Sequence, residues 1–178
     1  MGNILTYKDE LIKSMNWLSK NKRVVFLGQS VFYGDGAYRT LLDVSQSKKI
    51  EMPVAEDMQM GISIGLALQG FIPVTIYPRM DFLILSMNQL LNHLDKLEQL
   101  SKGKFKPKVI IRCIIGQKTP LYPGLQHCQD YTDIFKIMLK NIDVVKLENK
   151  NMIYESYMKA LKNNKSTLLV EMKELYDT

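Results

Sequence analysis

Two adjacent carboxylates stand at the start of an apolar segment, where an acidic side chain could do chemistry. Residues 53–70 read PVAEDMQMGISIGLALQG, so Glu56 and Asp57 precede a nearly uncharged run that ends at Gly70. A carboxyl group among apolar neighbours and at a helix N-terminus can exchange a proton near neutral pH, because the two surroundings act in opposite directions. The same carboxylates could simply complement the helix dipole, which is worth about 0.3–1 kcal/mol. The pattern alone leaves Glu56 as either a catalytic acid or a structural charge.

A histidine in a proline-containing loop is the second candidate. His127 lies in residues 123–130 (PGLQHCQD) and is one of two histidines in the chain. Imidazole titrates near neutral pH, so it can pass protons to and from a bound substrate. A loop histidine that is bonded only to the backbone is the alternative interpretation. The other histidine, His93, lies within an expected helix, and we interpret it as structural.

Alternating strands and helices must position these residues. Apolar runs predict strands at 23–28, 50–54, 71–77, 108–115, 144–148 and 166–172. Helical spacing predicts helices at 7–20, 56–69, 81–101, 132–140 and 151–164, with Thr6 and Asp81 as N-terminal caps. This alternation predicts an α/β three-layer sandwich with a mostly parallel sheet. We expect a single domain of residues 1–178, with an N-terminal helix in 1–22 and the core in 23–178. Ligands of such sheets bind beyond the carboxyl ends of the strands, where Glu56 and His127 would meet.

The composition excludes several classes of function. The 178 residues contain no apolar run that approaches the ~20 residues of a membrane span, so we expect no membrane partner. The net charge of +6 comes from scattered lysines without interleaved arginines and aromatics, which argues against nucleic-acid binding. Cys113 and Cys128 have neither metal nor redox spacing, so we expect a reduced, cytoplasmic protein.

Six stretches occur in a specific order along the chain. They are GQSVFYGDGAY (28–38), PVAEDMQMGISIGLALQGFIPV (53–74), RMDFLILSMNQLLNHLDK (79–96), VIIRCIIG with PGLQHCQD (109–116 and 123–130), and VEMKELY (170–176). Each is weak alone, but the ordered set resembles the pyrimidine-binding domain of thiamine-diphosphate-dependent enzymes. The resemblance is particularly to the β subunit of 2-oxoacid dehydrogenase first components and, more distantly, to transketolase. It runs from about Val24 to Tyr176, which is nearly the whole chain.

The resemblance implies a role for four residues. Glu56 would bind N1′ of the aminopyrimidine ring, which favours loss of the proton from the thiazolium C2 carbon. Phe82 and Val54 would line the pyrimidine ring, although ordinary core packing is an equal alternative for both. His127 would handle protons near the reacting carbon.

The same family packs the helix after Glu56 against partner subunits. Gly61 and Gly65 lie four residues apart on that helix, and small residues at this spacing let another helix approach closely. Close packing of Gly61 and Gly65 inside their own domain is the alternative.

The chain also departs from the family that it resembles. Its sequence stops at Thr178, where the family's β subunit continues into a further domain. A Gly-Asp-Gly triplet at Gly34–Gly36 lacks the later Asn that would complete a magnesium motif, so we interpret it as a turn. We therefore expect no metal ligands in this chain. The cofactors would be thiamine diphosphate and Mg²⁺, and a partner chain would hold the diphosphate and the metal.

These observations predict the pyrimidine-binding subunit of a split thiamine-diphosphate-dependent enzyme. It would act on a small 2-oxo acid by decarboxylation, carboligation or oxidative decarboxylation, in an α2β2 hetero-tetramer with its partner or as a homodimer of this chain. A non-catalytic regulatory or assembly subunit with the same fold is the alternative. A flavodoxin-like, nucleotide-binding module would need a phosphate-binding glycine loop that opens a helix directly after the first strand, and residues 28–38 are too extended to supply one.

Overall fold

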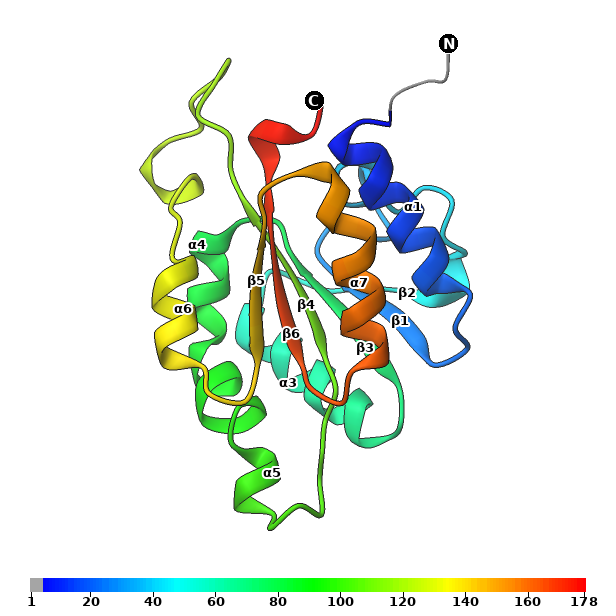
Figure 1. Cartoon of the computed structure of the whole chain (residues 1–178), viewed down its shortest axis with the longest axis vertical. Coiled ribbons are helices and arrows are strands. Elements are labelled where there is room, and N and C mark those ends of the chain that lie inside the picture. The colour runs from blue at the N-terminus through cyan, green and yellow to red at the C-terminus, as the bar shows by residue number, and fades with distance from the viewer. Residues whose placement is uncertain (1–4) are drawn as a thin grey trace.

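The computed structural model describes residues 5–178, which fold around one six-stranded sheet (Figure 1). The strands are β1 (Val24–Gly28), β2 (Lys49–Glu51), β3 (Ile72–Tyr77), β4 (Ile110–Ile115), β5 (Asp143–Leu147) and β6 (Thr167–Met172). They lie in the order β2-β1-β3-β4-β6-β5, and every neighbouring pair is parallel. The central strands are apolar because both faces of the sheet are covered. The predicted α/β class with a parallel sheet is confirmed.

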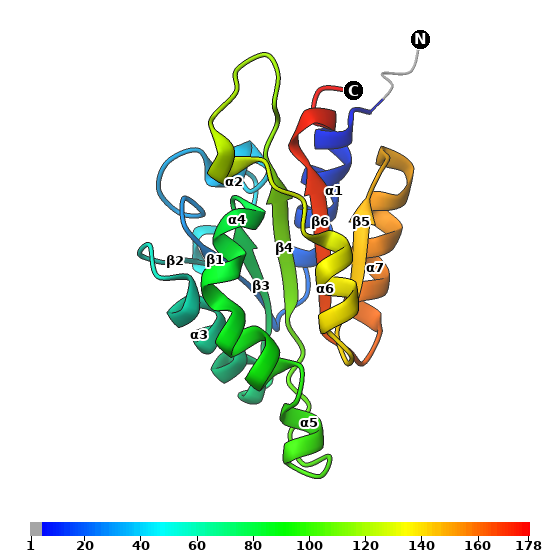
Figure 2. The ribbon, with the colours of Figure 1, turned by 90° about the vertical axis from the view of Figure 1, so that its left-hand side faces the viewer.

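Helices cover the sheet on both faces, which gives three layers (Figure 2). One face carries α1 (Tyr7–Ser19) and α7 (Ile153–Lys162), and the other carries α3 (Glu56–Leu68), α4 (Met80–Leu83) and α6 (Thr132–Met138). The shorter segments are α2 (Gly36–Arg39), η1 (Gln46–Lys48), η2 (Ile84–Ser86), η3 (Asn88–Leu94), α5 (Leu97–Leu100), η4 (Leu125–His127), η5 (Lys150–Met152) and η6 (Lys173–Leu175). Two separate apolar clusters fill the two interfaces between sheet and helices. None of the helices within residues 5–178 has the length and apolar character needed to cross a bilayer.

Local sequence signals explain where several helices begin and end. Thr6 and Asp9 form a reciprocal capping box at the start of α1, inside the predicted N-terminal segment 1–22, of which residues 1–4 lie outside the described part. Helix α3 begins at Glu56, and Gly70 follows its end with a φ of +89°, a conformation that favours glycine. Both helix boundaries agree with the prediction.

The long helix predicted at 81–101 is wrong in its continuity. The segment is divided into α4, the 3₁₀ turn η2, the π-helical turn η3 and α5. Arg79, and not Asp81, is the N-cap residue, and the Asp81 carboxylate instead accepts a bond from the backbone N–H of Gln129 at 3.4 Å. The π turn ends at Asp95, whose buried carboxylate accepts two backbone N–H groups from residues 140 and 141. These hydrogen bonds to a distant segment occur where the helix is interrupted, between η3 and α5.

A buried ion pair ties the last strands to α7. Arg112 and Glu171 are both fully buried, and the guanidinium donates to both oxygens of the carboxylate. The hydroxyls of Tyr157 and Tyr176 each donate to Glu171 across 2.6 Å. Burial alone would lower the pKa of Arg112, but the adjacent Glu171 carboxylate holds that pKa above its usual value. The charged pair is therefore fully compensated inside the core.

Candidate active site at the carboxyl edge of the sheet

Glu56 lies at the carboxyl edge of the sheet, at the first turn of α3. Glu56 is buried, with only 5% of its surface exposed. The amide Nε2 of Gln29, which directly follows β1, donates to Glu56 Oε1 across 3.1 Å. From β3, the hydroxyl of Tyr77 donates to the backbone carbonyl of Glu56 at 3.2 Å. Two neighbouring strands thus hold Glu56, one through its carboxylate and the other through its backbone carbonyl.

Another carboxylate fixes the loop that carries Gln29. The Glu51 side chain, at the end of β2, accepts hydrogen bonds from four consecutive backbone N–H groups, those of residues 30–33, at 2.6–3.2 Å. A carboxylate is a strong acceptor for such amides, so the loop is held directly beside Gln29. The sequence analysis did not identify Gln29 or Glu51. The available signal was for Glu51, an acidic residue that ends an expected strand in a chain with a glycine-rich loop to bind.

His127 and Phe82 are brought together from distant parts of the chain. Their rings meet edge to face, with centroids 5.5 Å apart and an angle of 82° between the ring planes. The loop 116–131 that carries His127 rises above the carboxyl edge at the top of Figure 2. A Cβ on Gly116 would lie 1.9 Å from the carbonyl oxygen of His127, so the loop can close here only over glycine. His127 Nδ1 is buried and has no hydrogen-bond partner among residues 5–178.

The other predicted contact, Val54, lies on the surface. Its side chain is 79% exposed, and no part of residues 5–178 buries it. The Gly-Asp-Gly triplet at Gly34–Gly36 forms a turn, as predicted, in which the Asp35 carboxylate accepts the N–H of Tyr38 at 3.1 Å. Within residues 5–178, no three His, Cys, Asp or Glu side chains cluster in a way that could hold a metal ion.

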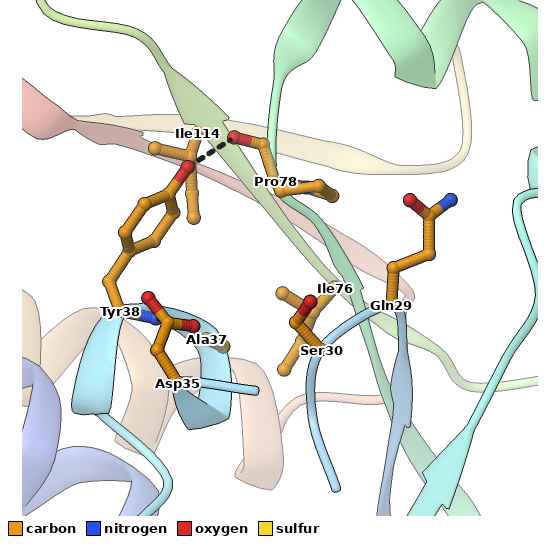
Figure 3. A pocket seen from close by; sticks show the side chains of 8 residues that line it. All are labelled: Gln29, Ser30, Asp35, Ala37, Tyr38, Ile76, Pro78 and Ile114. Atoms are coloured by element: carbon orange, nitrogen blue, oxygen red, sulfur yellow. Dashed lines mark hydrogen bonds between the residues drawn. The ribbon is translucent and has the colours of Figure 1, made fainter. Parts of the chain in front are cut away.

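A cavity of about 240 Å³ lies at the same edge of the sheet, and Figure 3 shows the side chains around it. Its lining side chains are Gln29, Ser30, Asp35, Ala37, Tyr38, Ile76, Pro78 and Ile114. Gln29 both lines this cavity and bonds to Glu56, so the two features are neighbours. The wall combines an amide, two hydroxyls and a carboxylate with apolar side chains, which suits a small polar molecule.

Arg79 is a further residue at this edge that the sequence analysis did not single out. It follows β3, and its Nη1 donates to the carbonyl oxygen of Pro78 at 2.7 Å and to the hydroxyl of Tyr38. Its guanidinium carbon lies 5.3 Å from the centre of the Tyr38 ring. Burial lowers the pKa of Arg79. A partly desolvated cation thus stands between the cavity and the His127 loop.

Comparisons with known proteins give a consistent picture. No protein-family profile matches the chain. It is 30% identical over 116 residues to the pyruvate dehydrogenase E1 component subunit β of Gracilaria tenuistipitata var. liui, which covers 63% of this chain and 35% of the relative. It is 28% identical over 133 residues to the chloroplastic subunit β-4 of Oryza sativa subsp. japonica, with 72% of this chain and 32% of the relative covered. The chain therefore spans about a third of the length of these relatives.

Solved structures share the fold. A split-gene transketolase in an inactive β4 tetramer superimposes with a TM-score of 0.75 at 16% identity, over 95% of this chain and 52% of that one. Transketolase from Campylobacter jejuni superimposes with a TM-score of 0.71 at 16% identity, over 95% of this chain and 26% of that one. The chain is thus similar in sequence to β subunits of the pyruvate dehydrogenase E1 component and has the fold of a transketolase domain, as the ordered motifs in its sequence predicted.

Proposed function

We propose that this chain is the pyrimidine-binding subunit of a thiamine-diphosphate-dependent enzyme that acts on a 2-oxo acid. The observation that carries the proposal is the buried Glu56 carboxylate, held by Gln29 at the carboxyl edge of a transketolase-like sheet. His127 and Phe82, which the family resemblance assigns to the same site, lie together at that edge. Similarity to pyruvate dehydrogenase E1 β subunits supports the same enzyme class.

The side chain of Glu56 fits an aminopyrimidine ring. Gln29 occupies Oε1, whereas Oε2 has no hydrogen-bond partner among residues 5–178 and is not sealed from solvent. That oxygen is free to hold a proton between itself and a ring nitrogen, which is the role proposed for Glu56 at N1′. When bound, thiamine diphosphate would supply a carbon nucleophile at C2 that adds to the oxo group of the substrate.

Three other side chains would complete the subunit's share of the site. Phe82 would lie against the pyrimidine ring, and its edge-to-face contact with His127 holds both rings in place. Nδ1 of His127 has no hydrogen-bond partner among residues 5–178, so a bound molecule would supply the partner that this buried atom lacks. Val54 would become an apolar wall only when another chain covers it.

We propose that a partner chain covers this edge and supplies the diphosphate and Mg²⁺ site. Large apolar side chains are exposed around the carboxyl edge and along α3, namely Val54, Met58, Ile62, Leu68, Leu85, Leu121, Tyr122 and Leu125. Exposed apolar surface of this extent is typical of interaction surfaces. On the same face of α3, a Cβ on Gly65 would meet no atom within 4 Å. A split-gene transketolase with a similar fold is inactive as a β4 tetramer, and by analogy this chain would need its partner for activity.

Substitution of Glu56 in the assembled enzyme tests the proposal. The chain is co-expressed with a companion that carries a complete Gly-Asp-Gly to Asn magnesium motif. Release of CO₂ from a panel of 2-oxo acids is then measured with and without thiamine diphosphate. Glu56→Gln should lower kcat by about 10²–10⁴-fold, the usual contribution of a group that transfers a proton.

Asp57→Asn is the matched control for Glu56→Gln. Asp57 is exposed, lies in the same helical turn and has a similar relation to the helix dipole. Its substitution should leave kcat within about twofold, because a dipole contribution is only about 0.3–1 kcal/mol of stability. Equal activity of Glu56→Gln and the unmodified complex would refute the catalytic role and favour an assembly subunit with the same fold.

A further inference from the structure

Two cations flank one aromatic ring at the carboxyl edge. Arg79 follows β3 and Lys173 follows β6, and the guanidinium carbon and the ammonium nitrogen each lie 5.3 Å from the centre of the Tyr38 ring. Lys173 also lies over the ring of Tyr176, at 4.4 Å. The ends of β3 and β6 thus supply two positive charges, and the loop 29–40 supplies the aromatic ring between them.

Neither cation has a carboxylate partner among residues 5–178. Every ion pair in that part of the chain involves other lysines or Arg112. Asp35 and Asp177 are close enough to influence Lys173, but neither comes within ion-pair distance, and Asp35 uses Oδ1 for the N–H of Tyr38. Burial lowers the pKa of Arg79, and Asp81 opposes this shift only in part. Burial also lowers the pKa of Lys173, against the effect of Asp177 and with that of Lys8 and Arg79. Partly desolvated charges without a counter-ion favour binding of an anion.

The orientation of the guanidinium leaves one end free for that anion. Nη1 is occupied by Tyr38 and Pro78, and Nε is buried beside Gly116 without a partner. Nη2 donates to no atom of residues 5–178 and is not among the buried unpartnered atoms, so it reaches accessible space. The contacts of Nη1 fix the direction in which Nη2 presents its two N–H groups.

We propose that Arg79, with Lys173 beside it, binds a second anionic group of the substrate. The inference rests on the proposed function, because it places the group in a 2-oxo acid. Arg79 contacts Tyr38 and Pro78, which line the cavity next to Gln29, so the guanidinium adjoins the cavity in which a substrate would lie beside the coenzyme held by Glu56.

The carboxylate adjacent to the oxo group is the poorer partner for Arg79. In decarboxylation that group gives up its negative charge as CO₂ leaves, so a cation fixed on it would stabilise the ground state more than the transition state. An anionic group at the far end of the substrate keeps its charge throughout the reaction. Binding it lowers KM without opposing the chemistry. The substrate class is therefore a 2-oxo acid with a second carboxylate or a comparable oxyanion.

Two substrates of equal chain length test this assignment in the assembled enzyme. 2-Oxoglutarate carries a distal carboxylate, and 2-oxopentanoate has a methyl group in its place. The unmodified complex should prefer 2-oxoglutarate in kcat/KM by about tenfold or more, and Arg79→Met should bring this ratio close to one through KM, because a hydrogen-bonded charge is lost. Arg23→Met is the control, since Arg23 is exposed and precedes β1 at the opposite edge. An equal loss of activity on both substrates in Arg79→Met would overturn the proposal.

A binding measurement on the chain alone separates this inference from the proposed function. The chain has four arginines, Arg23, Arg39, Arg79 and Arg112, so ¹⁵N-labelled Nε–Hε signals can be assigned by substitution. Titration with acetate and with inorganic phosphate should move the Arg79 signal while those of the exposed Arg23 and Arg39 stay in place. A response to phosphate alone would identify the distal group as phosphate-like, in support of the anion site. Equal shifts at Arg79 and Arg23 would refute an anion site, whatever the complex catalyses. A complex without activity on any 2-oxo acid, but with an Arg79 response, would refute only the proposed function.

Discussion

The side-chain amide of Gln29 donates to the Glu56 carboxylate across 3.1 Å, and so joins the end of β1 to the start of α3. Four backbone N–H groups of the following residues are bonded to Glu51, which leaves Gln29 little freedom to turn away. The carboxylate that we assign to the coenzyme is thus oriented by a side chain that does not itself ionise. Gln29 is a positioning residue, and Glu51 fixes it.

Removal of the Gln29 amide should weaken catalysis without unfolding the chain. A hydrogen bond to a charged group is worth about 1.5–3 kcal/mol, so Gln29→Ala should lower kcat/KM of the complex by about 10–100-fold. Gln99→Ala, at an exposed position on α5, is the control and should have no effect.

A positioning role for Gln29 also predicts what a conservative change does. Gln29→Asn keeps the amide but shortens its reach by one methylene, so it should recover little activity. Glu51→Gln should reproduce part of the loss, because it weakens the bonds that fix the loop. Full activity of Gln29→Ala in an intact complex would show that Glu56 is oriented by other contacts.

The fold was more predictable from the sequence than the site. Strands β3, β4 and β6 are continuous apolar runs because both sheet faces are covered, and such runs are visible without any knowledge of the fold. The start of α3 at Glu56 and its end before Gly70 follow from local signals. The break of the segment 81–101 was not visible, because residues 140 and 141, which bond to Asp95, lie 45 and 46 positions away in the chain.

The residues at the carboxyl edge differ in how far the sequence could point to them. Glu56 and His127 belong to ordered motifs, and the structure places both at the carboxyl edge. Gln29 and Arg79 gain their significance from contacts with Glu56 and Tyr38, which lie 27 and 41 positions away. Residue type alone gives no reason to single out a glutamine or an arginine in a loop. The roles that we propose for them rest only on the geometry, and those of Glu56, His127, Phe82 and Val54 toward the coenzyme and substrate stay predictions.

Substitution of Gly65 should show whether Gly61 and Gly65 of α3 pack against a partner helix or only within their own domain. A Cβ at this exposed helical position meets nothing within 4 Å, so Gly65→Ala should stabilise the isolated chain by up to ~1 kcal/mol, the difference in helix propensity. If a partner helix packs closely here, the same methyl group should weaken assembly. Urea unfolding of the chain and the mass of the complex by light scattering measure the two effects.

Gly61→Ala is the comparison for Gly65→Ala. Its Cβ would lie 3.8 Å from the side chain of Gln89, which is an ordinary van der Waals contact within the chain. Gly61→Ala should therefore also leave the chain folded. A Gly65→Ala chain that assembles as well as the unmodified one would contradict a close helix contact at this face.

Stability of the chain should fall steeply above pH 10. Burial raises the pKa of Tyr7, Tyr77, Tyr157 and Tyr176, and the Glu171 carboxylate raises three of them further, those of Tyr7, Tyr157 and Tyr176. In the folded chain these phenols stay protonated at a pH where the unfolded chain releases their protons, near 10. The unfolded state then binds fewer protons, so the free energy of unfolding decreases as pH rises. The stabilisation is complete below pH 10 and is lost as the pH approaches the raised pKa values.

The size of this effect depends on the number of buried tyrosines. Each buried phenol contributes a slope of about 1.4 kcal/mol per pH unit above 10, so the four together give roughly 5 kcal/mol per unit. Urea unfolding at pH 9, 10 and 11 measures the slope, and absorbance at 295 nm follows phenolate formation. The four buried tyrosines should form phenolates only on unfolding. Tyr157→Phe should reduce the slope by about one quarter. Phenolate formation at Tyr157 and Tyr176 near pH 10 in a chain that remains folded would contradict the buried network around Glu171.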